Sequence, residues 1–457
     1  MTRCTAASLA AWLVLAACGD SQNADKSTQY GSNPNLPQPS RALLPRMHVA
    51  DVIGWSQGEA PTVPEGFRIE AMATGLSNPR NVYAIPNGDV LVIESKKDAK
   101  EPIERPKRLL MDWIEAKAHG GSGGGGPSNR ILPHGGSGGG GPSNRILLLR
   151  DADGDGKPEA QSVLVDQLNS PFGVVLVGNA LYVADTDAIL RFPFTTGQTR
   201  VGGPPVKIVD LPAGPIDHHW TKSLTASADG SKLYVGVGSN SNAMERGIDA
   251  EANRAAIWEV DPATGAFKVF ASGLRNPNGL TFYPGSDTLW AVVNERDELG
   301  PDLVPDYMTS VKRGAFYGWP YSYWGQHVDP RVRPRRPDLV KSAITPDYGL
   351  SSHVAPLGLA FYTGTSFPAQ FHGGAFVGEH GSWNRPELNG YKVVFVRFQN
   401  GRPVGDPMDF VTGFIKNGKA RGRPVGVTVD RTGALIVADD VGNTVWRVTS
   451  TPAKPAK

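Results

Sequence analysis

One phrase recurs six times along the chain and limits its possible folds more than any other feature. Each copy has a turn with Pro or a polar residue, an apolar strand, a Gly or Asp-Gly turn, and a second apolar strand. Such repeats are typical of architectures in which each unit buries its faces only against its neighbours. The copies begin at Leu76, Leu168, His218, Leu274, His353 and Gly422.

Further strand-like runs lie between the copies, at 188–192, 256–260 and 393–397, so each unit has more than two strands. A last run at 444–448 nearly ends the chain, as the closure of a ring requires. We therefore predict an all-β fold, a six-bladed β-propeller with irregular loop insertions, over residues 61–450. The alternative is an array of β-sandwiches, against which the recurring phrase argues.

Two segments interrupt the repeats. Residues 119–132 recur word for word at 134–147, and their glycine content predicts a mobile loop over 116–145. The second interruption runs from 297 to 346 and is too long for a hairpin loop. We expect it to pack over one face of the ring.

The N-terminal segment has the pattern of an export signal. An apolar run at 6–17 is shorter than the about 20 residues that span a bilayer, but it fits a signal peptide over 1–17. Residues 15–19 resemble a bacterial lipobox, which implies lipid on Cys18. The alternative is an ordinary signal peptide with a chance cysteine. Because Cys4 and Cys18 are the only cysteines, the folded part has neither a disulfide nor covalently attached haem.

The polar stretch after the lipobox predicts a flexible tether over 18–60, and residues 451–457 form a short tail. We expect a periplasm-facing lipoprotein in the cell envelope of a bacterium, held to the membrane by its anchor. Lys+Arg (46) and Asp+Glu (44) nearly balance, giving a net charge of +2. This balance gives no reason to expect a nucleic acid as partner.

Polar residues stand where the first strands begin and the second strands end, and in a propeller these positions meet at the channel mouth. A structural role is the alternative for each of them, as a turn cap or a solvent-facing charge. The residues are His219, Arg275, Asn276, Asn294, Glu295, Arg296, Asp297, His380, Arg385, Arg421 and Arg423.

Several phrases together resemble the soluble pyrroloquinoline-quinone-dependent sugar dehydrogenases, a glucose and sorbosone dehydrogenase-like family, and in particular its sorbosone dehydrogenase-like branch. The resemblance covers residues 64–448, and the family's six-bladed propeller agrees with the repeat count. The phrases lie at 219–222, 238–242, 274–280, 293–297, 302–307, 317–320, 378–385 and 421–424.

The resemblance implies pyrroloquinoline quinone and calcium as cofactors. Arginine suits the three carboxylates of the quinone, so Arg275, Arg421 and Arg423 are expected to converge with His219 in one cavity. His219 matches the base that takes the hydroxyl proton of the sugar. The remaining cofactor-binding candidates are Asn276, Asn294, Arg296, His380 and Arg385.

The chain departs from the glucose-oxidising branch at two points. That branch has a Gly-Pro pair, whose carbonyls hold calcium, where this chain has residues 294–297, so Glu295 and Asp297 become metal candidates. Its cofactor-facing lysine is also absent from the fifth copy, where His380 or Arg385 stands instead.

Asp151, Asp153 and Asp155 have the spacing of a calcium-binding loop, but Ser162 stands where a bidentate Glu is expected. Strand-like runs flank them, which favours a hairpin with Asp-Gly turns over a weak structural calcium site.

The sequence therefore predicts an enzyme that oxidises an aldose or a related sugar aldehyde. His219 takes a proton, hydride passes to the calcium-activated quinone, and electrons leave to an external acceptor because the chain has no haem motif. One alternative is a calcium-dependent lactonase-like hydrolase, which would use carboxylates and Asn around the metal, and the arginine-rich rim argues against it. Another is a non-catalytic propeller that binds carbohydrate or protein.

Overall fold

The computed structural model describes residues 25–40, 47–97, 143–214 and 218–451. Within these ranges, no helix is long and apolar enough to cross a membrane. The predicted signal peptide, Cys18, most of the Gly-rich segment 116–145 and residues 452–457 lie outside them.

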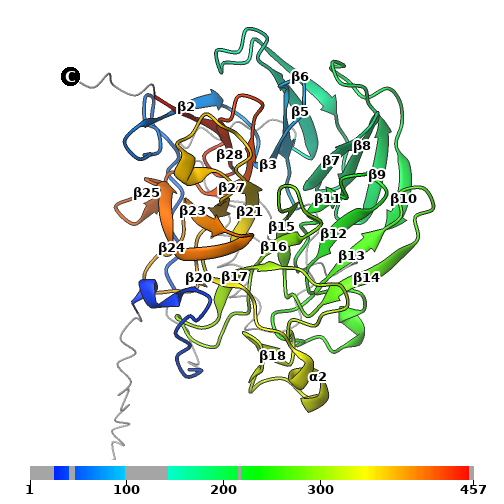
Figure 1. The fold of residues 1–457 in the computed structure, drawn as a ribbon, viewed down its shortest axis with the longest axis vertical. Helices are drawn as coiled ribbons and strands as arrows, with labels where there is room; N and C mark the ends of the chain where they lie inside the picture. The colour runs from blue at the N-terminus through cyan, green and yellow to red at the C-terminus, as the bar shows by residue number, and fades with distance from the viewer. Residues whose placement is uncertain (1–24, 41–46, 98–142, 215–217, 452–457) are drawn as a thin grey trace, which may run out of the picture.

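Six antiparallel sheets of four blade strands each surround a central channel (Figure 1), which confirms the predicted propeller. Each copy of the recurring phrase supplies the two innermost strands of one blade. Blade one has β3 (Pro79–Ala84), β4 (Val90–Glu94), β5 (Arg145–Arg150) and β6 (Ala160–Val165), and blade two has β7 (Gly173–Val177), β8 (Ala180–Ala184), β9 (Ala188–Pro193) and β10 (Val206–Asp210). Blade three has β11 (Leu224–Ala226), β12 (Leu233–Val237), β13 (Ala256–Val260) and β14 (Phe267–Ser272), and blade four has β15 (Pro277–Phe282), β16 (Leu289–Val293), β17 (Pro305–Ser310) and β20 (Tyr348–Ser352). Blade five has β21 (Pro356–Phe361), β22 (Ala375–Glu379), β23 (Lys392–Gln399) and β24 (Arg402–Val411), and blade six has β27 (Pro424–Val429), β28 (Leu435–Asp439), β29 (Thr444–Ser450) and β2 (Phe67–Ala73).

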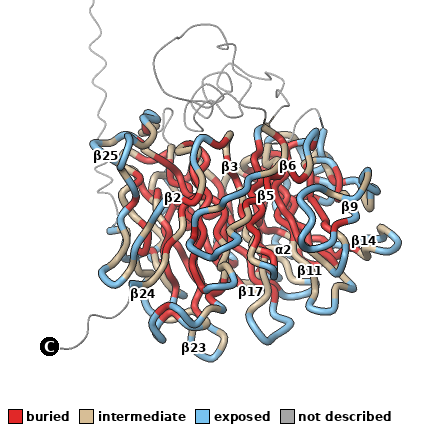
Figure 2. The backbone as a smooth tube through the Cα atoms, turned by 90° about the horizontal axis from the view of Figure 1, so that it is seen from above, coloured by how far each residue is buried: buried red, intermediate tan, exposed pale blue. Residues whose placement is uncertain are grey.

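The second strand of each blade is almost completely buried. All residues of β4, β12, β16, β22 and β28 are buried, because side chains on both faces of these strands pack against the neighbouring blades. The fourth strand of blade two, β10, is mostly exposed or half-buried. Figure 2 shows the buried backbone concentrated inside the ring, with exposed segments at its edges.

The ring closes between the two ends of the described chain. Strand β2 pairs antiparallel with β29, with Phe67 opposite Ser450 and Ile69 opposite Val448. An N-terminal strand thus completes the blade whose other three strands are C-terminal. The repeats did not predict this strand, because β2 belongs to no copy of the phrase.

Part of the segment expected to be a tether packs on the ring, so that expectation is wrong there. Strand β1 (Tyr30–Gly31) pairs with β20, and Gln29 is fully buried, where its amide donates a hydrogen bond to the Asp302 carbonyl (2.6 Å). Trp55 packs edge-on against Trp446, with ring centroids 5.2 Å apart. These contacts order the chain well before the first blade strand.

The segment 297–346, predicted to be one insertion, is instead part blade strand and part insertion. Its residues Pro305–Ser310 form β17, an integral strand of blade four. The remainder carries the hairpin β18 (Ser322–Tyr323) and β19 (His327–Val328) and the short helix α2 (Pro337–Ser342). Figure 1 shows β18 and α2 at the perimeter of the disc rather than over a face.

Candidate functional site

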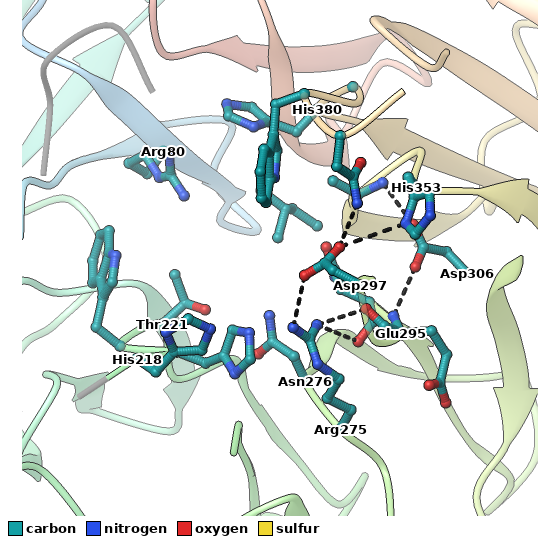
Figure 3. Close-up of a pocket in the computed structure, with 18 residues that line it drawn as sticks. Arg80, His218, Thr221, Arg275, Asn276, Glu295, Asp297, Asp306, His353 and His380 are labelled. Carbon is teal, nitrogen blue, oxygen red and sulfur yellow. Dashed lines mark hydrogen bonds and ion pairs between the residues drawn. The ribbon is translucent and has the colours of Figure 1, made fainter. Parts of the chain in front are cut away.

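A cavity of about 890 Å³, its open mouth included, lies at the channel end where the first strands begin. Its lining comes from β3, β17 and β21, from the segments that precede β11, β15 and β21, and from those that follow β16 and β22 (Figure 3). This is the rim that the repeats predicted. Of the predicted residues it brings together His219, Arg275, Asn276, Asn294, Glu295, Asp297 and His380.

The surroundings of His219 fix which of its ring nitrogens carries the proton. Nδ1 lies 2.9 Å from the carbonyl oxygen of Ser239 and 3.1 Å from its hydroxyl oxygen. That hydroxyl donates its own hydrogen to the Ser241 carbonyl (2.7 Å), so both groups facing Nδ1 are acceptors. Nδ1 therefore holds the proton, and the lone pair of the neutral ring is on Nε2.

Gly238 is required by the close approach of two of the lining residues. A Cβ at this position would lie 2.5 Å from Asn276 Oδ1 and 2.5 Å from His219 Cβ. Any side chain here would displace the amide or the imidazole. Glycine at this position therefore allows the 238–242 segment to approach His219 closely enough for Ser239 to contact Nδ1.

Arg275 uses all of its hydrogen-bond donors within the protein. Nε donates to the Asn242 carbonyl (3.2 Å), and Nη1 donates to the carbonyls of Asn294 (3.3 Å) and Glu295 (2.6 Å). Nη2 donates to Asn242 Oδ1 (3.0 Å) and Asp297 Oδ2 (3.1 Å). A guanidinium has five N–H groups, so this arginine is a brace for the loop after β16.

Arg275, Asp297 and Asp306 form what we call the blade-four wall. Asp306 accepts hydrogen bonds from the backbone N–H groups of Glu295 (2.7 Å) and Ala355 (2.8 Å). Burial raises the pKa of Asp306 to about 8, with a smaller contribution from the neighbouring carboxylates. The wall thus holds a carboxyl group that resists ionisation beside Asp297, which is paired with Arg275.

Arg80, His380 and Asp440 form the closure wall, which joins blades one, five and six. His380 Nε2 donates to Asp440 (2.9 Å), and Arg80 Nη1 donates to the same carboxylate (2.6 Å). Burial, assisted by cationic Arg423, lowers the pKa of His380 to about 4. Burial would raise the pKa of Asp440, but its contacts with His380 and Arg80 outweigh burial and hold that pKa below its usual range.

The expectation that Arg421 and Arg423 converge with His219 in the cavity is wrong. Arg421 donates to the Gly413 carbonyl, and its guanidinium carbon lies 4.6 Å from the Trp55 ring centroid. Arg423 is buried behind the cavity wall, where it donates to the carbonyls of His380 (2.8 Å) and Gly381 (2.7 Å). Neither side chain lines the cavity.

Arg296 and Arg385 are also buried without lining the cavity. Arg296 pairs with the carboxylates of Glu295 (2.9 Å) and Asp329 (3.3 Å). Arg385 pairs with Asp302 (2.7 Å). Both expected cofactor contacts are therefore replaced by buried ion pairs, and the Glu295 side chain is engaged in one of them.

The acidic loop of blade one lies on the hairpin that joins β5 to β6, as the Asp-Gly turns predicted. Ligand atoms of Asp151, Asp153, Asp155 and Glu159 lie within 4.8 Å of one another. Backbone N–H groups of Gly154 and Gly156 donate to Asp151. The favoured hairpin is confirmed, and a weak structural calcium site stays the untested alternative.

Sequence reasoning missed Arg80, Asp306, His353 and Asp440. The sequence did hold a signal for Asp440. Buried acids end the second strands at Glu94, Glu379 and Asp439. Asp440 directly follows Asp439 just as the predicted residue His380 directly follows Glu379, so the two residues occupy equivalent positions in their blades. Arg80 was missed because it follows the proline that opens its strand, whereas Arg275 precedes the corresponding Pro277.

Comparison with known proteins finds a matching family model and similar folds. Residues 184–444, more than half of the chain, match the family model described as Glucose / Sorbosone dehydrogenase. An uncharacterized protein of Borreliella burgdorferi is 28% identical over 292 residues, which is 62% of this chain and 76% of that protein.

Two solved structures share the fold. The holo form of the pyranose dehydrogenase PQQ domain from Coprinopsis cinerea aligns with a TM-score of 0.66 and 19% identity, over 88% of this chain and 100% of that one. The calcium structure of a Trichoderma reesei carbohydrate-active enzyme of family AA12 aligns with a TM-score of 0.65 and 19% identity, over 86% of this chain and 97% of that one.

Proposed function

The chain belongs to the Glucose / Sorbosone dehydrogenase family, and from that premise we propose that it oxidises an aldose or a related sugar aldehyde with pyrroloquinoline quinone and calcium. The observation that carries the proposal is the pair of Ser239 oxygens beside Nδ1 of His219, the carbonyl at 2.9 Å and the hydroxyl at 3.1 Å. From it we assign the proton to Nδ1 and the basic lone pair to Nε2 of this cavity-lining residue. Electrons then pass to an external acceptor.

His219 Nε2 takes the proton of the sugar hydroxyl as the bond from the oxidised carbon to its hydrogen breaks. When bound, the quinone supplies the two-electron acceptor for the departing hydride, and calcium supplies Lewis-acid polarisation of that acceptor. The hydrogen bonds of Nδ1 to Ser239 hold the ring in orientation and stabilise the imidazolium that forms.

The donor set of the blade-four side fits calcium. The side-chain oxygens of Asn276 and Asn384 are buried without a hydrogen-bond partner, and both residues line the cavity. The carboxylates of Asp297 and Asp306 line the same cavity. Calcium prefers such hard oxygen ligands, so these four residues would hold it.

Other residues of the lining fit a planar, anionic ring system. Trp220 and Trp383 line the cavity and offer flat apolar faces, and Arg80 adds a positive charge. Asparagine and carboxylate around a metal also suit the lactonase-like alternative, and membership in a dehydrogenase family argues against that alternative.

We further propose that Cys18 carries a lipid and holds the enzyme in the bacterial cell envelope, facing the periplasm. The support is the lipobox resemblance and the polar segment that follows it. Metabolic labelling with palmitate should mark the unmodified protein and leave Cys18→Ser unlabelled. Labelling of both proteins to the same extent would contradict the anchor.

The decisive experiment replaces His219 by Ala in full-length protein reconstituted with calcium and quinone. Turnover of aldoses with an artificial electron acceptor should fall about 10²- to 10⁴-fold, the usual contribution of a general base. Quinone binding, followed by fluorescence quenching, should change little. His327→Ala, in the exposed β19, serves as the control and should keep full activity.

Three results would contradict the proposal. Undiminished turnover in His219→Ala would remove the base. Quinone-independent, calcium-dependent hydrolysis of sugar lactones would establish the hydrolase alternative. Absence of both quinone binding and turnover in the unmodified protein would favour the non-catalytic binding propeller.

A further inference from the structure

Two arginines line the cavity in the part of the chain that the structure describes, and they differ in their hydrogen bonds. Arg275 has donated all five of its N–H groups to oxygens of the protein. Arg80 donates to Asp440 through Nη1, and its Nε is buried without a hydrogen-bond partner. Leaving a buried, charged donor without a partner is costly, so this N–H group requires an acceptor from outside the protein.

The geometry of Arg80 leaves one edge of its guanidinium for a ligand. Asp440 binds Nη1, so the edge formed by Nε and Nη2 is the one that this carboxylate does not occupy. The side chain is held in place, because Arg80 is only 7% exposed and its guanidinium carbon lies 5.3 Å from the Trp220 ring centroid. Figure 3 shows Arg80 across the cavity from Arg275 and Asp297.

The charges around the cavity favour an anion at Arg80. Among the described residues that line it, the acidic ones are Glu295, Asp297 and Asp306, all on the blade-four side. Asp440 lies behind the lining, where it is engaged by Arg80 and His380. Arg80 is therefore the one charged side chain with which the closure wall lines the cavity among the described residues, and Asp440 balances its charge from behind the lining.

We propose that Arg80 binds a carboxylate of the ligand through its Nε–Nη2 edge, the role that the sequence assigned to Arg275, Arg421 and Arg423. Two parallel N–H donors at a fixed spacing match the two oxygens of a carboxylate. Trp220, whose ring lies beside the Arg80 guanidinium, directly follows His219 in the sequence, and both residues line the cavity.

This inference rests on the proposed function, which places both a quinone and a sugar in the cavity. The carboxylate belongs either to the quinone, which has three, or to an acidic sugar such as a uronic acid. Both sources share the chemistry that Arg80 recognises. In the second case the preferred substrates of the enzyme are anionic aldoses.

The test uses full-length protein with calcium and compares Arg80→Gln and Arg80→Lys with the unmodified chain. Arg313→Gln is the matched control, because Arg313 also lies over an aromatic ring (Phe270) and pairs with a carboxylate (Glu259) but does not line the cavity. Binding of pyrroloquinoline quinone and of its trimethyl ester is measured by quenching of tryptophan fluorescence. KM is then measured for glucose and for glucuronate at saturating quinone.

If the carboxylate belongs to the quinone, Arg80→Gln weakens quinone binding about ten- to hundredfold, and binding of the ester changes little. Arg80→Lys, which keeps the charge but loses the paired donors, falls in between. If the carboxylate belongs to the sugar, quinone binding is unchanged, and the KM for glucuronate rises about tenfold or more while that for glucose stays constant.

Binding of the quinone and KM values for both sugars that stay within about twofold of the unmodified chain in Arg80→Gln would overturn the proposal. Should Arg80→Gln fail to fold, the double variant with Asp440→Asn removes both buried charges and carries the same test. Quinone binding that depends on Arg80 without any sugar oxidation would overturn the proposed function and support the role of Arg80. Sugar oxidation in which neither quinone binding nor the KM of either sugar depends on Arg80 would support the proposed function and overturn the role of Arg80.

Discussion

The two walls of the cavity are both built from arginine and aspartate, yet they use these residues differently. The blade-four wall lies within one blade and its adjoining loops, and Arg275 satisfies every donor there. The closure wall joins three blades, and Arg80 keeps a donor without a partner. The difference shows that the place of an arginine in the sequence does not decide its role. An arginine whose donors are all bonded within the protein stabilises a loop, whereas one with an unpartnered donor can bind a ligand.

Replacing Arg275 by Gln should break the blade-four wall and produce the largest change in stability. Asp297 would lose its ion pair and three backbone carbonyls would each lose one donor, so we expect a loss of about 3–5 kcal/mol in the free energy of unfolding. Urea titration measures this loss. Arg80→Gln should lose less, because His380 still donates to Asp440. If Arg275→Gln keeps its stability but loses quinone affinity, the two roles are reversed.

The walls should also respond to pH with opposite signs. His380 has a pKa lowered to about 4, so the unfolded chain binds a proton more readily, and its contribution of about 3 kcal/mol is full above pH 6.5 and lost as pH falls toward 4. In the calcium-free protein, Asp306 has a pKa raised to about 8, so its contribution is full below about pH 4 and lost as pH rises through 8.

Urea midpoints measured from pH 4 to 8 check these signs. His380→Gln should flatten the dependence between pH 4 and 6.5, whereas His372→Gln, in a residue that does not line the cavity, should not. An unchanged acid slope in His380→Gln would show that His380 does not resist protonation in the folded protein.

Arg421→Gln should have the smallest effect on stability and on quinone affinity. It tests whether Arg421 lies outside the binding site. Arg421 contacts Trp55 and the partly exposed Glu59 outside the cavity, so we expect a loss of about 1 kcal/mol or less in the free energy of unfolding. Quinone affinity should stay within about twofold of the unmodified chain in the same fluorescence titration. A tenfold loss would return Arg421 to the binding site.

Most of the fold could be predicted from the sequence because the blades repeat one local pattern. The inner strands of all six blades were predicted by apolar runs and turn residues, which act over a few residues. Strand β2 escaped prediction because its pairing with β29 depends on closure of the ring rather than on local sequence. Likewise, β17 was hidden in a segment whose length suggested a loop.

The site was predicted less completely, and the reason is physical. Strand ends placed His219, Arg275, Asn276, Asp297 and His380 at the rim, because backbone position follows from the repeats. The direction of a long side chain does not follow from the repeats, and Arg421 turns away to Gly413 and Trp55. The pairing of Arg80 with Asp440 joins residues 360 positions apart, which local patterns do not reveal.

The pairing of β2 with β29 also orders events during biosynthesis. The first blade strand to leave the ribosome is the last to find its neighbour, because residues 444–450 must emerge before it can pair. Asp440 directly precedes β29, so its contact with Arg80 forms only after the strands of blades one to five have emerged. A nascent chain can therefore stack most of its blades early, but both walls of the cavity are in place only after residues 440–450 have emerged.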